Sequence, residues 1–383
     1  MLVMNSCKIV YCIGGTYNSG GMERVLANKA NWLVEHGYEV IIVTTEQQGR
    51  PSFFKFDKRI KFYDLGIGYE DNNGKSFINK LVHYPFKQYR HRKQLDALLQ
   101  QVKPDITISM FGNEASFVPM IKDGSKKILE IHFSRFKRLQ YGRKGLWRFA
   151  DKWRYETDAK IVGLYDKFVV LTEEDKGYWG NLPNIEVIPN PRTFSVDETA
   201  LLDSKIVIAV GRLNHQKGFE RLIKAWAIVV QYITDWNLQI IGDGELRDDL
   251  QCQIDKLGLS DKVSLNKTET DMVSVYKNAS ILAMTSHYEG LPMVLLEAQA
   301  AGLPIVSFDC KCGPKDVIED GKSGFLVPNG DIDLFAKKMM MLIKDNGMRK
   351  SMGKSAFQNS TRYSENLIMQ KWVELFKLVT RNV

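Results

Sequence analysis

Long hydrophobic segments, paired cysteines and proline-rich stretches are all scarce in this sequence of 383 residues. No apolar run approaches the ~18 residues that a membrane-spanning helix needs. The short apolar start ends in Gly14 and Gly15 without a small-residue cleavage site, so we expect neither a membrane span nor an export signal. The five cysteines are scattered, and Cys310 and Cys312 lack the two-residue spacer of redox or zinc pairs. Reduced thiols in a cytoplasmic protein are therefore the expectation.

The second half of the chain is nearly neutral, whereas the first half has an excess of basic residues. The whole chain carries 53 Lys and Arg against 45 Asp and Glu, a net charge of +8. Residues 51–154 hold 22 basic and 10 acidic residues, whereas residues 201–383 hold 23 and 22. Hydrophobic residues make up 44% and charged residues 26%, which is typical of a globular protein and excludes a disordered or fibrous chain.

Short apolar runs alternate with amphipathic, helix-length stretches along the whole chain. In the first half the spacing predicts strands over residues 9–13, 40–43, 106–108, 128–131 and 168–171. In the second half it predicts strands over residues 206–210, 238–241, 263–265, 281–284 and 305–307, with a last amphipathic helix over 365–379. Parallel strands joined by helices need crossover connections, so the pattern predicts an α/β protein with two doubly wound parallel sheets.

The length suffices for two domains, each with its own core. We place the boundary at Pro189 and Pro191, because two prolines prevent a helix from continuing and suit a hinge. The predicted domains are residues 1–190 and 191–360, and residues 361–383 are expected to form a helix that crosses back to the first domain. Ligands of open parallel sheets bind outside the carboxyl ends of the strands, so we expect the active site in the cleft between the domains.

Two glutamates flank an expected helix start in the segment S-H-Y-E-G-L-P-M-V-L-L-E-A-Q-A-A-G. Pro292 suits the first turn of a helix, and the amides of Met293 and Val294 would then form an anion site that suits a phosphate. Glu289 and Glu297 would hold hydroxyl groups at the two ends of a nucleotide-sugar. Two surface glutamates on an Ala- and Leu-rich helix are the competing explanation.

Two cations stand five positions apart in the segment G-R-L-N-H-Q-K-G, directly after an expected strand. Gly211 at the strand end permits close approach of a ligand, and Arg212 and Lys217 can flank one anionic group such as a departing diphosphate. Taken alone, the two residues are also consistent with solvated surface cations.

Together these segments resemble the retaining GT-B nucleotide-sugar glycosyltransferases of glycosyltransferase family 4, of the bacterial surface-polysaccharide type. The family's glutamate pair matches Glu289 and Glu297, and its Arg-x4-Lys pair matches Arg212 and Lys217. Order and spacing agree over most of the chain for S-G-G-M-E-R-V-L-A-N, H-G-Y-E-V, I-P-N-P, I-G-D-G and D-G-K-S-G-F-L-V. The resemblance implies two Rossmann-like domains, with residues 1–190 on the acceptor side and residues 191–360 binding the nucleotide-sugar.

The resemblance also implies roles for individual residues. Arg212 and Lys217 would stabilise the diphosphate leaving group, Glu289 would contact the donor sugar near its 3-hydroxyl, and His132 would lie near the reaction centre. Glu297 would contact the ribose. The remaining expected substrate-binding residues are Gly20, Gly21, Gly211, Gly242, Lys267, Gly290, Leu291, Met293 and Val294.

The implied reaction transfers a hexose or N-acetylhexosamine from a nucleotide-sugar, with UDP favoured, to a hydroxyl of a glycan or lipid-linked acceptor in capsule, exopolysaccharide or lipopolysaccharide synthesis. The resemblance implies no cofactor and no catalytic metal. Asp331 and Asp333 are similar to the Asp-x-Asp metal motif of a different glycosyltransferase fold, but Asp331 is expected to cap the next helix. A sugar-nucleotide epimerase or hydrolase of the same fold, or a non-catalytic lipid- or nucleic-acid-binding protein, remains an alternative.

Aromatic residues are interleaved with basic residues in the first domain. This combination suits nucleic acid or an anionic membrane face. Because related enzymes act on lipid-linked acceptors, we expect peripheral contact with the inner face of the cell membrane rather than with nucleic acid. A plain solvated surface is the alternative. The residues are Lys87, Arg90, Arg92, Lys93, Arg135, Phe136, Lys137, Arg138, Tyr141, Arg143, Lys144, Trp147, Arg148, Lys152, Trp153 and Arg154.

Overall fold

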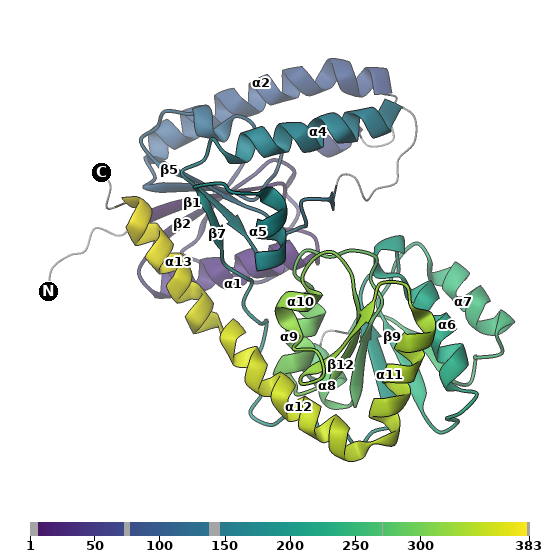
Figure 1. Ribbon diagram of the computed structural model, residues 1–383. Coiled ribbons are helices and arrows are strands. Elements are labelled where there is room, and N and C mark those ends of the chain that lie inside the picture. The colour runs from purple at the N-terminus through teal and green to yellow at the C-terminus, as the bar shows by residue number, and fades with distance from the viewer. Residues whose placement is uncertain (1–6, 73–76, 138–145, 270, 381–383) are drawn as a thin grey trace, which may run out of the picture. The chain divides into compact units, whose positions relative to one another are not determined.

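The computed structural model describes residues 7–72, 77–137, 146–269 and 271–380. The chain divides into two compact units, which are described separately below (Figure 1). Unit 1 comprises Met1–Leu171, Lys176–Ile188 and Met369–Val383, and unit 2 comprises Thr172–Asp175 and Pro189–Ile368.

Unit 1 is built on a seven-stranded parallel sheet with the strand order β3-β2-β1-β4-β5-β6-β7. The central strands are buried along nearly their whole length, which explains their continuous apolar sequence. The strand order reverses between β1 and β4, the position at which open sheets bind ligands. The strands are β1 (Lys8–Ile13), β2 (Glu39–Thr44), β3 (Lys61–Asp64), β4 (Ile106–Ser109), β5 (Lys126–Glu130), β6 (Lys167–Val170) and β7 (Ile185–Val187).

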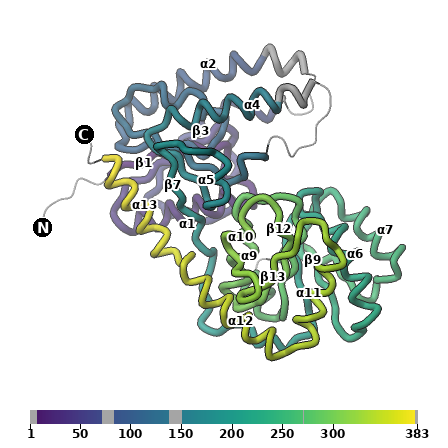
Figure 2. Tube along the Cα trace, in the orientation of Figure 1, coloured from purple at the N-terminus to yellow at the C-terminus, as the bar shows by residue number. Residues whose placement is uncertain are grey.

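Helices cover both faces of the unit 1 sheet. Helices α2 (Phe77–Val102) and α4 (Leu146–Val162) run side by side over one face, and α1 (Gly21–Glu35) lies on the other (Figures 1 and 2). The α1 helix ends before Gly37, whose φ of 86° is the left-handed conformation expected after a helix. The remaining helical elements are η1 (Tyr69–Asn72), η2 (Val118–Met120), and most of α5 (Glu173–Trp179) and α13 (Glu365–Thr380), whose first residues belong to unit 2.

Unit 2 repeats the plan with a six-stranded parallel sheet in the order β10-β9-β8-β11-β12-β13. Its strands are β8 (Ile206–Val210), β9 (Asn237–Ile241), β10 (Val263–Asn266), β11 (Ile281–Met284), β12 (Ile305–Asp309) and β13 (Gly324–Pro328). Its helical elements are η3 (His215–Lys217), α6 (Phe219–Val229), α7 (Arg247–Lys256), α8 (Met272–Lys277), α9 (Met293–Ala300), α10 (Pro314–Val317), α11 (Ile332–Lys344), α12 (Asn346–Ser360) and η4 (Thr361–Tyr363).

The predicted α/β fold class with two doubly wound parallel sheets is confirmed, and every strand expected from an apolar run is present. Three strands were not predicted: β3, β7 and β13. All three lie at sheet edges, and β3 is exposed at all four positions, so no buried apolar run marks it. Asp331 caps α11 as expected, because its side chain accepts a hydrogen bond of 3.0 Å from the Leu334 amide. No helix among the described residues is long and apolar enough to cross a membrane.

Candidate active site

The loops that follow β8 and β9 in unit 2 pack backbone against backbone. Gly211 N donates to the Ile241 carbonyl at 3.0 Å, and Leu213 N donates to the Asp243 carbonyl at 2.9 Å. A Cβ at Gly242 would overlap the Gly211 carbonyl oxygen, so this close approach requires glycine. The predicted residues Gly211 and Gly242 are therefore brought together at the carboxyl end of the sheet.

Lys217 is held at the end of the loop that follows β8. The Asn214 side chain caps the short helix η3 by accepting from the Lys217 amide. Gly218 then adopts a φ of 61°, and a Cβ there would overlap the Thr285 carbonyl oxygen. This tight turn directs the chain into α6 and places Lys217 beside the segment that follows β11.

Lys217 and Glu289, which are 72 residues apart, form an ion pair. The Lys217 ammonium donates to Glu289 Oε1 at 2.7 Å, and the two side chains are 19% and 7% exposed. Gln216 lies beside them and donates to the Tyr288 carbonyl at 3.1 Å. Because β8 and β11 are parallel neighbours, both loops leave the sheet at the same edge. Two of the four predicted catalytic residues are thus in direct contact.

The backbone of Glu289 is fixed by the loop that follows β12, which the sequence reasoning did not include in the site. Glu289 N donates to the Lys311 carbonyl at 2.8 Å, and Cys312 N donates to the Glu289 carbonyl at 3.2 Å. Gly313 has a φ of 97° and lies against Pro292 and Gly290. No local sequence pattern indicated that Cys312 and Gly313 contact this segment.

Glu297 lies on α9, which begins at Met293 with Pro292 as the residue before it. Its carboxylate is buried and accepts from two hydroxyls: Thr193 Oγ1 at 2.7 Å and the Tyr276 hydroxyl at 2.8 Å. These two partners come from distant parts of unit 2, so sequence reasoning missed them. A surface glutamate on a solvated helix face is excluded for this residue.

The other predicted residues of unit 2 lie in loops that follow strands of its sheet or at the start of α9, and no ion pair is described for them. The side chains of Arg212 and Lys267 are exposed, and Lys267 follows β10 at the same edge of the sheet. Leu291 is buried in the loop before α9. Gly290, Met293 and Val294 are half-buried at the start of that helix.

The predicted residues of unit 1 lie at two loops. Gly20 is the residue before α1 and has extended backbone, and Gly21 begins the helix. His132 follows β5, and its side chain is 5% exposed. Its Nε2 lies 3.1 Å from Glu130 Oε1, but neither ring nitrogen has a hydrogen bond of good geometry among the described residues.

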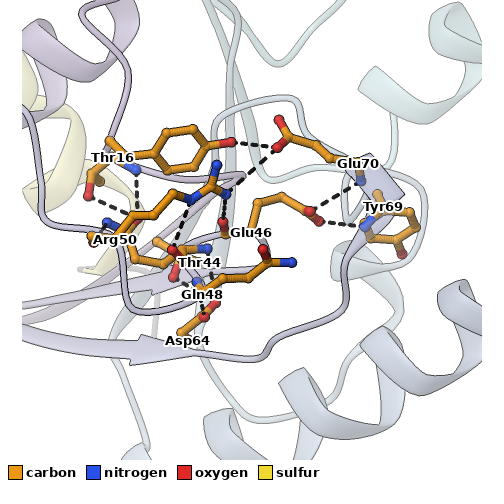
Figure 3. Close-up of polar contacts among 10 residues, drawn as sticks. Thr16, Thr44, Glu46, Gln48, Arg50, Asp64, Tyr69 and Glu70 are labelled. Carbon is orange, nitrogen blue, oxygen red and sulfur yellow. Dashed lines mark hydrogen bonds and ion pairs between the residues drawn. The ribbon is translucent and has the colours of Figure 1, made fainter. Parts of the chain in front are cut away.

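A polar network that sequence reasoning missed ties together the loops after β1, β2 and β3 in unit 1 (Figure 3). Buried Glu46 accepts from the amides of Tyr69 at 2.7 Å and Glu70 at 3.2 Å. Burial raises the pKa of Glu46, although these amides oppose the shift. Arg50 stacks over the ring of Tyr17 at 3.3 Å, and the Tyr17 hydroxyl donates to Glu70 at 2.7 Å. The network fixes the carboxyl edge of this half of the sheet.

The basic and aromatic residues of unit 1 are only partly on the surface. Arg135 packs beside the rings of Tyr155 and Trp179, each 5.0 Å away, and donates to the Tyr178 carbonyl. Exposed cations on α2 and α4 include Arg90, Arg92, Lys93 and Lys152. Arg138, Tyr141, Arg143 and Lys144 lie outside the described residues, as do the side chains of Trp147 and Arg148.

Two family models match this chain. One, described as Glycosyltransferase Family 4, matches residues 19–192, and the other, Glycosyl transferases group 1, matches residues 192–359. The chain is 29% identical to the amylovoran biosynthesis glycosyltransferase AmsD of Erwinia amylovora, over 96% of this chain and 99% of the relative. It is 31% identical to an uncharacterized glycosyltransferase of Haemophilus influenzae, over 95% and 98%.

A third relative and a solved structure extend the comparison. The chain is 28% identical, over 96% of its length and 98% of the relative, to an N-acetyl-D-galactosaminyltransferase of Campylobacter jejuni that acts on a PP-undecaprenol-linked glycan. The crystal structure of a TarM mutant of S. aureus with fondaparinux, alpha-GlcNAc-glycerol and UDP superposes with a TM-score of 0.76 at 19% identity, covering 97% and 99% of the two chains. The chain therefore belongs to the glycosyltransferases of family 4 and has their GT-B fold, and its relatives include enzymes of bacterial surface-polysaccharide synthesis.

Proposed function

We propose that this protein is a retaining, metal-independent hexosyltransferase that moves a hexose or N-acetylhexosamine from a UDP-sugar to a hydroxyl of a glycan or lipid-linked acceptor. The observation that carries the proposal is the contact of Lys217 with Glu289 at the carboxyl edge of the unit 2 sheet. The solved structure of TarM contains UDP, and the Campylobacter relative acts on a glycan linked to PP-undecaprenol, which favours this donor and acceptor.

The ion pair of Lys217 suits a site that must bind both a sugar and a diphosphate. An ammonium group has three donors, and Glu289 uses one of them. The others, with the exposed guanidinium of Arg212, are available to the diphosphate oxygens as negative charge develops on the leaving group. Glu289 retains acceptor capacity for hydroxyls of the donor sugar, since the Lys217 contact occupies only part of its carboxylate.

Glu297 is proposed to bind the ribose. Its carboxylate accepts hydroxyl hydrogen bonds from Thr193 and Tyr276, which shows that it is oriented toward hydroxyl donors, the groups that a ribose presents. The amides of Met293 and Val294 at the start of α9 are proposed to contact the diphosphate. From unit 1, we assign His132, Gly20 and Gly21 to the same reaction.

The proposed chemical step breaks the bond between the anomeric carbon and the diphosphate oxygen, and both bonding electrons leave with the diphosphate. The sugar becomes oxocarbenium-like, and the acceptor hydroxyl attacks the anomeric carbon from the face just vacated. The hydroxyl proton passes to the departing diphosphate. This sequence retains the anomeric configuration without a protein nucleophile. Arg212 and Lys217 supply the positive charge, so the step invokes no metal.

A thermal-shift panel with UDP, GDP and ADP, followed by donor turnover, tests the proposal. We expect UDP to stabilise the protein most. Arg212→Ala and Lys217→Ala should each lower turnover by ~10²–10³, the typical effect of removing one group that stabilises developing charge. Lys224→Ala is the control, because Lys224 is an exposed cation of α6 that lies outside the site.

Three outcomes would contradict the proposal. Unchanged turnover in both site variants would falsify the roles assigned to Arg212 and Lys217. Donor conversion that is equally fast with and without acceptor would indicate an epimerase or hydrolase instead, and the products distinguish these two. Absence of any nucleotide affinity would favour a non-catalytic binding protein.

We also propose that α2 and α4 contact the inner face of the cell membrane. Phe86, Tyr89 and Trp153 on these helices are 69%, 67% and 66% exposed, next to exposed cations. Exposed aromatic rings beside Lys and Arg suit the interface of an anionic bilayer. Flotation with anionic liposomes should show binding at low salt that weakens at high salt and in a Phe86→Ser/Trp153→Ser variant. No binding at low salt contradicts the contact.

A further inference from the structure

A lysine is completely buried in unit 1. Lys29 on α1 is 1% exposed, and its ammonium donates to both carboxylate oxygens of Glu130, at 2.8 and 2.7 Å. Glu130 is also 1% exposed. Moving two charges out of water is expensive, and a buried ion pair is weak evidence for a stabilising role. The presence of this pair therefore calls for an explanation other than stability.

Aromatic rings enclose the ammonium on its remaining sides. The ring of Trp372, on α13, lies 3.5 Å from Lys29 Nζ, and the ring of Tyr11, on β1, lies 5.5 Å away. Both contacts are within the range of cation–π attraction. Helix α13 and strands β1 and β5 thus each supply a side chain that contacts the Lys29 ammonium.

Glu130 links this buried cation to His132. Glu130 is the last residue of β5, and its Oε1 lies 3.1 Å from His132 Nε2. Burial by itself would raise the pKa of Glu130, but Lys29 and then His132 outweigh it and hold the pKa at about 2. The carboxylate is therefore an anion that contacts a lysine on one side and an imidazole on the other.

The imidazole of His132 has unused hydrogen-bonding capacity. Both of its nitrogens are buried, and neither forms a hydrogen bond of good geometry among the described residues. A buried polar group without a partner costs free energy, so such a group in a native fold needs a reason. At 3.1 Å, Glu130 Oε1 is close enough to accept a hydrogen bond from Nε2–H. That hydrogen bond would leave Nδ1 with its lone pair directed away from Glu130.

We propose that Glu130 and Lys29 are positioning residues for His132: Lys29 holds the Glu130 carboxylate in place, and Glu130 selects the His132 tautomer that carries its proton on Nε2. The unprotonated Nδ1 is then the acceptor that His132 keeps for the reaction to which it is assigned. Trp372 keeps the ion pair dry. This inference rests on the proposed function, because it assumes that His132 meets the substrate.

The test removes both charges together. Deleting one partner of a buried pair leaves an uncompensated charge and destabilises the fold, whereas replacing both with apolar residues is often tolerated. Lys29→Met/Glu130→Leu is therefore the main variant. We expect kcat to fall ~10-fold to 10²-fold while the Kd for UDP stays unchanged, since a positioning role affects the reacting geometry.

A double-mutant cycle separates positioning from a general loss of packing. His132→Asn should lower kcat in the natural protein but cause little further loss in the Lys29→Met/Glu130→Leu background. The matched control is Lys127→Met/Asp123→Asn, because Lys127 and Asp123 form another ion pair of unit 1 with side chains only 6% and 0% exposed. This control should leave the effect of His132→Asn undiminished.

Imidazole nitrogen shifts in ¹⁵N NMR give a readout that does not depend on activity. The signal that disappears in His132→Asn belongs to His132, and we expect it to show the Nε2–H tautomer in the natural protein. An Nδ1–H tautomer, or full additivity in the kinetic cycle, overturns the inference. Failure of the proposed function would look different, because the natural protein would then show no nucleotide affinity or turnover.

Discussion

Gly313 offers a test of how tightly the candidate active site is built. Its φ is 97°, and a Cβ at this position would lie 2.6 Å from Pro292 Cδ and 2.7 Å from the Gly290 carbonyl oxygen. Both neighbours belong to the segment that joins Glu289 to α9. Gly313→Ala therefore forces this segment to move, and Glu289 moves with it.

The structure sets the size of the effect. Because real Cβ atoms are essentially never closer than 3.0 Å to such neighbours, the segment must shift by a few tenths of an ångström. A misplacement of about 1 Å costs on the order of 10²-fold in rate, so we expect a loss of roughly 10-fold in turnover. The left-handed backbone adds about 1–2 kcal/mol of destabilisation for any residue other than glycine.

Gly330 provides a closely matched control. Its φ is 96°, but nothing lies within 4 Å of the position where its Cβ would be. Gly330→Ala should therefore show the same backbone penalty in thermal or urea unfolding but keep natural donor turnover. Gly313→Ala should lose both stability and donor turnover, and its Kd for UDP should rise.

Two results of this comparison would refute the reasoning. If folded Gly313→Ala and Gly330→Ala have the same turnover and the same Kd for UDP, the packing of the Gly313 loop does not hold Glu289 in its working position. A loss of activity confined to Gly330→Ala leads to the same conclusion.

Three further changes have expected outcomes. Glu297→Gln replaces one carboxylate oxygen with an NH2 group, which then faces the hydroxyl donor of Thr193 or Tyr276, so the Kd for UDP should rise roughly 10-fold, about 1.4 kcal/mol. The exposed Asp333→Asn should leave this Kd unchanged in calorimetry. Trp226→Ala should lower the free energy of unfolding by about 3–5 kcal/mol in urea titration, because it empties a buried site. Trp226→Phe should lower it far less, because the buried indole N–H has no described hydrogen bond to lose. Burial lowers the pKa of His91 to about 4, so the unfolded chain binds its proton first as the pH falls. On account of this residue, the free energy of unfolding should decrease by about 3 kcal/mol between pH 6.5 and 4. Urea unfolding at pH 7 and 4.5 should therefore show a smaller decrease for His91→Gln than for the natural protein. An equal decrease in the two proteins contradicts this prediction.

The pattern of apolar residues along the chain predicted most of the fold. The central strands of both sheets are buried on both faces, so their sequences are unbroken apolar runs. The edge strand β3 is exposed at all four positions, so no such run marks it. The sequence also identified Lys217 and Glu289, because the two segments that carry them together resemble glycosyltransferase family 4. Their contact at 2.7 Å depends on the adjacency of β8 and β11, which no local pattern encodes.

The sequence by itself determined the two parallel-sheet domains, the loops at their strand ends and the charged residues that those loops carry. Only the tertiary structure decided which of these residues meet. Thr193 reaches Glu297 across 104 positions, and Lys29 reaches Glu130 across 101. The physical reason is that strand neighbours and helix packing, rather than distance along the chain, place these side chains together. A buried charge therefore becomes recognisable as paired only once the fold is known.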